Sequence, residues 1–237
     1  MSGESQFARA VKPLIAHVPG WLTDEEGEAL YELAKQCTGR GVIVEIGSWK
    51  GKSTICLGLG SRAGSSVRIY AIDPHADYRF GDFKQNVDRA GIGDLVTPIA
   101  SLSQPAADEF HEPIELLFVD GSHEEALVAE DFDKWVPKVV DGGWVAFHDT
   151  TWTAGPRRVV GERVYRSRKF KDVRFVVGSM TIARKVAENT LADRARARYV
   201  LGVKTAFWLG SNALKKQRRL LPKPVERLGR RMLRAIQ

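Results

Sequence analysis

Short hydrophobic runs alternate with longer amphipathic stretches from residue 42 onward. Helical spacing of apolar residues predicts helices over residues 53–59, 78–90, 104–110 and 124–136. Seven apolar, β-branched runs have the length of buried strands, and these are residues 42–46, 67–72, 95–100, 116–119, 144–147, 173–177 and 180–183. This alternation indicates an α/β fold with a doubly wound, mostly parallel sheet.

The two ends of this pattern predict additions to the parallel sheet. The last two strands flank the Gly-Ser pair at 178–179, which suits a tight type II′ turn and predicts a closing antiparallel hairpin. Thr23 with Glu26 forms a capping box that opens a helix over residues 24–37, and a further helix is expected over residues 191–208. We therefore expect three regions: an N-terminal helical cap (1–40), an α/β domain (41–185) and a basic helical C-terminal extension (186–237).

The basic charge of the chain is concentrated at its C-terminal end. The 237 residues carry a net charge of +7, but residues 211–237 hold nine Lys or Arg against Glu226 alone, so residues 1–210 sum to −1. Three interpretations stay open for this tail: a helix packed on its own subunit or a symmetry mate, an amphipathic helix on anionic lipid, and a nucleic-acid contact. The tail has no aromatic residue for base stacking, so nucleic acid is not the expected partner.

Length and cysteine content favour an ordinary cytoplasmic protein. Two cysteines, Cys37 and Cys56, offer neither a disulfide framework nor a paired metal motif. The first residues lack a signal-peptide pattern, and no apolar run approaches the ~20 residues of a membrane span. We expect a cytoplasmic location, with peripheral membrane contact through the C-terminal tail as an addition.

The segment VIVEIGSWKGKST, residues 42–54, has the features of a ligand-binding loop. Glycines allow a ligand to approach the backbone closely, and the following helix presents its positive N-terminus. Only three residues separate Gly47 from Gly51, one fewer than a Walker A loop needs, and the dinucleotide fingerprint is also broken. Glu45, placed before the first glycine, suits a cationic cofactor. Asp73 closes the second strand, where a carboxylate can accept the hydroxyls of a ribose.

Titratable residues also follow the fourth and fifth predicted strands. Asp120 and His123 come after the fourth strand, and His148 and Asp149 come after the fifth. Ligands of open α/β sheets bind at the carboxyl ends of the strands, so these groups are candidates for one site. The structural alternative is that Asp120 caps a helix and His148 fills a core position.

The motifs at residues 45–54 and 70–74 resemble motifs one and two of class I S-adenosylmethionine-dependent methyltransferases. Over residues 40–185 the chain resembles the Methyltransferase 24-like group, which includes metal-dependent sugar and macrolide-sugar O-methyltransferases and cephalosporin hydroxylase-like proteins. The resemblance implies a Rossmann-like, seven-stranded sheet. It also implies an S-adenosylmethionine site formed by Glu45, Gly47, Ser48, Gly51, Ser53, Asp73, Ala100, Ser101 and Asp120.

The same resemblance implies roles for the residues after the fourth and fifth strands. Asp120, His148 and Asp149 would ligate a divalent metal, Mg²⁺ or Mn²⁺, and His123 would be the general base. Imidazole is softer than the ligands that Mg²⁺ prefers, so Fe²⁺ and Zn²⁺ are alternatives, as is a role for His148 outside the metal ligands. The substrate hydroxyl would bind the metal, lose its proton to His123 and attack the sulfonium methyl group.

We therefore predict an O-methyltransferase for a small-molecule hydroxyl, first of a sugar or glycoside, that forms a homodimer or a higher homo-oligomer. The substrate mouth is expected to draw on Trp49, Tyr78, Trp152 and residues 154–157. Alternatives are a phenolic acceptor, a metal oxygenase using Asp120, His123 and His148, and a non-catalytic cofactor-binding scaffold. A dehydrogenase is disfavoured by the glycine pattern.

Overall fold

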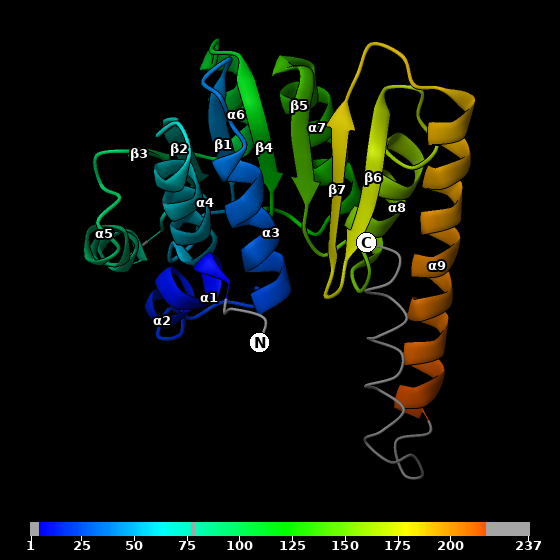
Figure 1. Ribbon diagram of the computed structural model, residues 1–237, viewed down its shortest axis with the longest axis horizontal. Helices are drawn as coiled ribbons and strands as arrows, with labels where there is room; N and C mark the ends of the chain where they lie inside the picture. The colour runs from blue at the N-terminus through cyan, green and yellow to red at the C-terminus, as the bar shows by residue number, and fades with distance from the viewer. Residues whose placement is uncertain (1–4, 77–78, 217–237) are drawn as a thin grey trace.

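The computed structural model describes residues 5–76 and 79–216 of the chain. Its centre is one seven-stranded sheet with the strand order β3-β2-β1-β4-β5-β7-β6 (Figure 1). The strands are β1 (Val42–Ile46), β2 (Ile69–Asp73), β3 (Val96–Ala100), β4 (Ile114–Val119), β5 (Val139–Phe147), β6 (Phe170–Val176) and β7 (Met180–Lys185). The first five strands are parallel, and β7 runs antiparallel to both of its neighbours. The predicted Rossmann-like sheet with a closing hairpin is confirmed.

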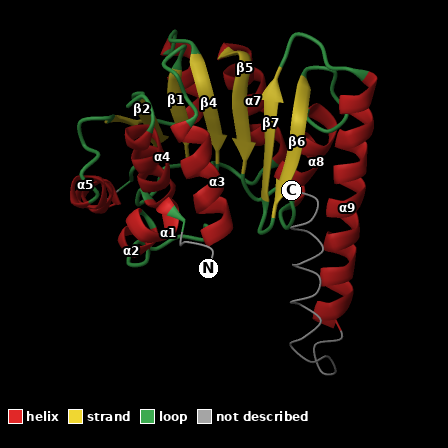
Figure 2. Ribbon diagram, viewed as in Figure 1, coloured by secondary structure: helices red, strands yellow, loops and turns green. Residues whose placement is uncertain are grey.

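Helices cover both faces of this sheet (Figure 2). One face carries α1 (Gln6–Ala10), α2 (Lys12–Ile15), α3 (Asp24–Lys35), α4 (Lys52–Ala63) and α5 (Arg79–Arg89). The other carries α6 (Ser103–Glu109), α7 (Glu125–Trp135), the 3₁₀ turn η1 (Val136–Lys138) and α8 (Ala154–Arg163), and α9 (Leu191–Lys216) runs along β6. Because successive strand residues point to opposite faces, Ile43 and Val44 belong to two separate hydrophobic clusters, one beneath each helical layer.

Two strand details differ from the sequence prediction. β5 begins at Val139 rather than at residue 144. The sequence pattern missed its first residues because the strand is irregular there: Gly142 takes a φ of +81° and the register with β4 shifts, which interrupts the apolar pattern. In the hairpin, Val176 pairs with Met180, so three residues connect β6 and β7 instead of the two of a type II′ turn. Ser179 is consequently part of the connection, where its backbone faces α3.

Helices differ from the prediction as well. Residues 154–163 form α8, a helix that the sequence pattern did not predict; proline is tolerated in a first helical turn, so Pro156 does not break the helix. α9 continues to Lys216, beyond the predicted end at residue 208. Within the described part of the chain, no helix combines the length and apolar character needed to cross a membrane. The tail beyond residue 216 lies outside the described residues, and the three proposed regions stay predictions.

Candidate active site

A large cavity lies at the carboxyl ends of β1, β2, β4 and β5. It has a volume of about 890 Å³, and Ile46, Asp73, Asp120 and His148 mark where these strands end in its wall. β1 and β4 flank the point at which the strand order reverses, which is where open α/β sheets bind ligands. The N-terminal part of α3 contributes Glu26 to the same wall, so the helical cap closes one side of the cavity.

Gly47 allows the loop after β1 to touch the loop after β4. Its φ is +86°, and a Cβ atom there would lie 2.1 Å from the backbone oxygen of Asp120. The two loops are also joined by a hydrogen bond of 2.8 Å from the Asp120 amide to the Ile46 carbonyl. Only glycine combines this conformation with this close approach. The backbone position of Asp120 therefore depends on the absence of a side chain at residue 47.

Glu45 lies beneath the loop rather than in the cavity. Its fully buried carboxylate accepts hydrogen bonds from the hydroxyls of Ser53 and Thr54, in the first turn of α4. Burial raises the pKa of Glu45 to about 7, although the two hydroxyls oppose that shift. Glu45 therefore holds α4 against β1 and does not line the cavity, whereas the sequence predicted that it contacts the cofactor.

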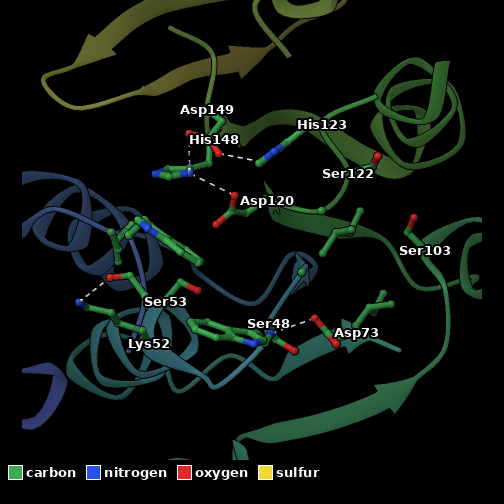
Figure 3. Close-up of a pocket in the computed structure, with 18 of the residues that line it drawn as sticks. Ser48, Lys52, Ser53, Asp73, Ser103, Asp120, Ser122, His123, His148 and Asp149 are labelled. Carbon is green, nitrogen blue, oxygen red and sulfur yellow. Dashed lines mark hydrogen bonds and ion pairs between the residues drawn. The ribbon is translucent and has the colours of Figure 1, made fainter. Parts of the chain in front are cut away.

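Asp73 is held by the two segments that pass over it. Its Oδ2 accepts a hydrogen bond from the Trp49 amide at 2.9 Å (Figure 3), and its Oδ1 accepts one from the His75 amide at 2.8 Å. A carboxylate has about four lone-pair positions, so two backbone donors leave acceptor capacity for a ligand. The loop and the acid at the end of β2 therefore form one preorganised unit.

Six of the nine predicted cofactor-binding residues line the cavity, namely Gly47, Ser48, Ser53, Asp73, Ser101 and Asp120. The other three, Glu45, Gly51 and Ala100, are not among its lining residues. Gly51 instead forms the N-cap of α4 with a φ of +85° and shapes the loop from outside the cavity.

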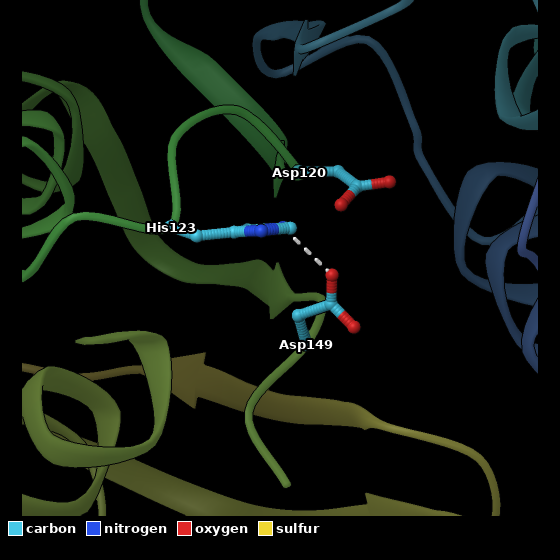
Figure 4. A group of neighbouring side chains, drawn as sticks. All are labelled: Asp120, His123 and Asp149. Carbon is cyan, nitrogen blue, oxygen red and sulfur yellow. Dashed lines mark ion pairs between the residues drawn. The ribbon is translucent and has the colours of Figure 1, made fainter. Parts of the chain in front are cut away.

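Asp120, His123 and Asp149 meet in one corner of this cavity. Each can offer a ligand atom, and these atoms lie within 4.8 Å of one another (Figure 4). His123 Nε2 is 2.8 Å from Asp149 Oδ2. The pKa of Asp149 is lowered mainly by the His148 side chain, whereas burial raises the pKa of Asp120. Asp149 also has a φ of +54°, a conformation uncommon for a residue with a side chain and frequent at functional sites.

His148 lies outside that group of three. Its Nδ1 is 3.1 Å from Asp120 Oδ1 and its Nε2 is 3.3 Å from Glu26 Oε2, and the residue is only 6% exposed. Burial lowers the pKa of His148, but Asp120, Asp149 and Glu26 together outweigh burial and raise it to about 12. Among the described residues, the group of ligand atoms within 4.8 Å of one another contains His123, whereas the resemblance implied Asp120, His148 and Asp149, and that ligand set stays a prediction.

Glu26 is the site residue that the sequence pattern did not reveal. Its capping box is present, with Glu26 Oε2 accepting from the Thr23 amide at 2.9 Å. The same carboxylate accepts a hydrogen bond of 2.5 Å from the Ser179 amide and pairs with His148, so it joins α3, the hairpin and the end of β5. Its pKa is lowered because these partners outweigh its burial. The capping box by itself explains why a glutamate occurs at residue 26. Its contacts with Ser179 and His148 join residues far apart in the chain, so no local sequence pattern predicts them.

The mouth of the cavity is apolar and aromatic. Trp21, which is 84% exposed, stacks on Trp49 with 5.5 Å between ring centroids and 19° between ring planes. Trp152 also lines the cavity and donates its indole N–H to the Gly178 carbonyl at 3.1 Å. Trp49 and Trp152 line the cavity as predicted, residues 154–157 do not, and Tyr78 lies outside the described residues.

Residues 44–150 match the model of a family described as a methyltransferase domain. This segment runs from β1 to just beyond β5 and contains the glycine loop, Asp73 and the Asp120–His123–Asp149 group. The matched segment is thus similar to a methyltransferase domain, and the sheet has the Rossmann-like topology of solved methyltransferase structures.

Solved structures with the same fold include O-methyltransferases. A cofactor-bound protein from MTB, Rv0187, superposes with a TM-score of 0.60 at 18% identity, covering 80% of this chain and 93% of that one. The O-methyltransferase from Bacillus cereus in complex with SAH gives 0.59 at 18% identity, over 78% and 93% of the two chains. TomG from Streptomyces achromogenes, an O-methyltransferase involved in tomaymycin synthesis and solved with SAM, gives 0.56 at 18% identity, over 78% and 92%.

Proposed function

We propose that this protein transfers the methyl group of S-adenosylmethionine to a hydroxyl of a small molecule, and that His123 removes the proton of that hydroxyl. The observation that carries the proposal is the 2.8 Å contact between His123 Nε2 and Asp149 Oδ2, in the wall of the cavity that also contains the glycine loop. A carboxylate that accepts from one imidazole nitrogen leaves the other nitrogen as the proton acceptor.

The cofactor would lie along the glycine loop and the ends of β2 and β4. Asp73 keeps acceptor capacity for the ribose hydroxyls, and Gly47 allows the ligand to reach the backbone closely. The cofactors named for the similar structures from Bacillus cereus and Streptomyces achromogenes, SAH and SAM, agree with this assignment. Asp120 lies between the loop and His123, so it connects the cofactor part of the cavity with the acceptor part.

The Asp120–His123–Asp149 group fits a divalent cation. Its two carboxylates, Asp120 and Asp149, are suitable donors for Mn²⁺ and for Mg²⁺, and His123 would stand beside the cation as the proton acceptor. The buried His148 balances only one of the three carboxylate charges around it, so the cluster keeps negative charge that favours a cation. When bound, such a cation stabilises the negative charge that develops on the acceptor oxygen.

Aromatic side chains indicate the acceptor class. The face of Trp21, stacked on Trp49, is suited to a sugar ring, and we propose a sugar or glycoside as the first acceptor. A phenol is the second candidate, because Leu102, Leu127 and Trp152 make the rest of the mouth apolar.

The test starts with calorimetric titration of the full chain with S-adenosylhomocysteine, followed by a methyl-transfer screen over sugars, glycosides and phenols. His123→Ala is expected to lower the rate roughly 10²–10⁴-fold with unchanged S-adenosylhomocysteine affinity. His111→Ala, which changes an exposed histidine outside the cavity, is the matched control. An undiminished rate in His123→Ala would remove this residue from the mechanism, and the absence of S-adenosylhomocysteine binding would defeat the whole proposal.

Metal dependence is tested separately. Treatment with EDTA is expected to lower the rate, and Mg²⁺ or Mn²⁺ to restore it. Asp120→Asn and Asp149→Asn are expected to weaken the restoring effect, because each removes a charged donor. Full activity of the metal-free protein would refute the role of the cation. The proposed removal of the proton by His123, assisted by Asp149, would still stand.

The homo-oligomer, the cytoplasmic location and the peripheral membrane contact of the tail stay predictions. Most of the basic tail, residues 217–237, lies outside the described residues. Sedimentation analysis would test the subunit number, and co-sedimentation with anionic liposomes at low and high salt would test the membrane contact.

A further inference from the structure

A second cavity lies where α8 and α9 meet, apart from the site described above. It has a volume of about 270 Å³ and is lined by Thr151, Arg157, Arg158, Gly161, Glu162, Arg166, Leu201, Lys204, Thr205 and Trp208. It shares no lining residue with the first cavity. Thr151 lines the second cavity and its neighbour Trp152 lines the first, so the segment after Asp149 contributes to both.

This second cavity is strongly basic. Four of its lining residues are cations, Arg157, Arg158, Arg166 and Lys204, whereas Glu162 is its only acidic lining residue. Arg158 pairs with Glu125 at 2.9 Å. In the described part of the chain, the other three cations have no carboxylate within ion-pair distance. The cavity therefore concentrates positive charge that the protein itself does not balance.

Lys204 is the most buried of these cations. The residue is 3% exposed, and its Nζ donates to the Thr181 hydroxyl at 3.2 Å and lies 5.2 Å from the centroid of the Tyr165 ring. A neutral hydroxyl and an aromatic face compensate only part of the cost of removing an ammonium group from water. A buried ammonium ordinarily has an anionic partner, so the site lacks the negative charge that would complete it.

Arg157 is held in a fixed orientation in the same wall. Its guanidinium lies 4.2 Å from the centroid of the Trp208 ring, and its Nη1 donates to the Thr151 carbonyl at 3.4 Å. Stacking leaves the edge of a guanidinium available for the parallel hydrogen bonds with which arginine binds oxyanions. Arg157 and the buried Lys204 thus both line a space large enough for a small anion.

We propose that the cavity between α8 and α9 is a binding site for a phosphate group, carried by a free phosphate ester or by an anionic lipid headgroup. Phosphate offers three or more acceptor oxygens and close to two negative charges near neutral pH, which matches several cations in one cavity better than a single carboxylate does. Lys204 and Arg157 are its main ligands, and Arg166 adds positive charge at the exposed side. The site is independent of the proposed methyl transfer.

The first test is calorimetric titration of the full chain with inorganic phosphate at constant ionic strength. Lys204→Met and Arg157→Gln are each expected to lower phosphate affinity at least about 10-fold, the effect of losing a charge-assisted hydrogen bond. Arg198→Gln is the matched control, because Arg198 is an exposed cation of α9 outside the cavity, and its affinity is expected to stay within about 2-fold. Phosphate stabilises most proteins by exclusion from their surface, so a shift in melting temperature shared by all variants does not count as binding.

The second test distinguishes the two sources of phosphate. The wild-type chain and the three variants are sedimented with vesicles of phosphatidylcholine alone and of phosphatidylcholine with phosphatidic acid. All four proteins keep residues 217–237, so any contribution of the basic tail is the same in each. Lys204-dependent binding to the acidic vesicles identifies a lipid headgroup, and Lys204-dependent binding to inorganic phosphate alone identifies a soluble ester.

Phosphate and vesicle affinities that are the same in all four proteins, or no binding by the wild-type chain to either probe, would overturn the proposal. Methionine is close to lysine in volume and carries no charge, so Lys204→Met is expected to fold. Arg157→Gln, at a half-buried position, decides the outcome should the Lys204 variant unfold.

Discussion

Replacing Gly47 with alanine is expected to disturb both the stability of the protein and its cofactor site. The new Cβ would lie 2.1 Å from the backbone oxygen of Asp120, far inside the contact distance of two such atoms, and neither backbone segment has a flexible end that could move aside. The loop after β1 and the loop after β4 must separate by about 1 Å, which moves Asp120 away from the glycine loop.

The magnitude follows from two separate costs. A left-handed conformation costs a residue with a side chain roughly 1–2 kcal/mol. Forcing the two loops apart adds about 1–3 kcal/mol, the usual range for overpacking a rigid region. Gly39→Ala is the matched control: Gly39 has a φ of +88°, almost the same as the +86° of Gly47, but its Cβ would meet nothing within 4 Å. Gly39→Ala should therefore show the first cost alone.

Denaturant unfolding of both variants measures the free energy of unfolding, and calorimetry measures S-adenosylhomocysteine affinity. We expect Gly47→Ala to be less stable than Gly39→Ala and to bind S-adenosylhomocysteine at least about 10-fold more weakly than the wild type, whereas Gly39→Ala keeps wild-type affinity. Equal stability of the two variants, together with unchanged cofactor affinity in Gly47→Ala, would refute the close approach as the reason for glycine.

Three further predictions concern other parts of the molecule. Glu26→Gln removes a carboxylate beside the buried His148 and should cost about 3 kcal/mol near pH 7. Because the pKa of Glu26 in the folded protein lies below its ordinary 4.5, that stabilisation is fully present above pH 4.5 and is lost as the pH falls through the lowered pKa. Unfolding curves of the wild type and the variant should therefore differ by a constant amount above pH 4.5 and draw together in more acidic buffers. Burial lowers the pKa of Lys204 from 10.5 to about 7, so the unfolded chain binds more protons between these values. Stability should therefore rise with pH across that window by up to about 1.4 kcal/mol per pH unit, an increase that Lys204→Met should lack in thermal melts in phosphate-free buffer. Trp21→Ala removes the exposed half of the Trp21–Trp49 stack and should raise KM for the acceptor more than it lowers kcat. Steady-state kinetics with the acceptor found in the screen would measure both constants. A fall confined to kcat would contradict the proposal that this stack binds the acceptor.

The periodicity of apolar residues was sufficient to predict the sheet. β1 is reproduced residue for residue, because a buried parallel strand leaves an unbroken β-branched run such as residues 42–46. The start of β5 and the whole of α8 were missed, since Gly142 and Pro156 resemble element breakers in the sequence. Both residues are tolerated where they stand, one at an irregularity in the ladder and the other in a first helical turn.

The sequence predicted which residues lie near the candidate site more completely than it predicted which of them contact one another. The sequence alone determined that Gly47, Asp73, Asp120, His123 and Asp149 would follow strand ends, because parallel strands bring their carboxyl ends to one edge. It did not decide which of two histidines joins the two aspartates.

That choice was made by tertiary structure. Glu26 reaches the end of β5 from α3 and pairs with His148, which takes this imidazole out of the cluster and leaves His123 beside Asp149. The basic cavity between α8 and α9 has the same origin, since Arg157 and Lys204 belong to helices whose packing the local sequence does not specify. The sequence by itself determined the strands and the residues at their ends, because both depend on local periodicity. Side-chain pairing across distant elements was decided only by the folded structure, because burial and charge there depend on the packing of the whole chain.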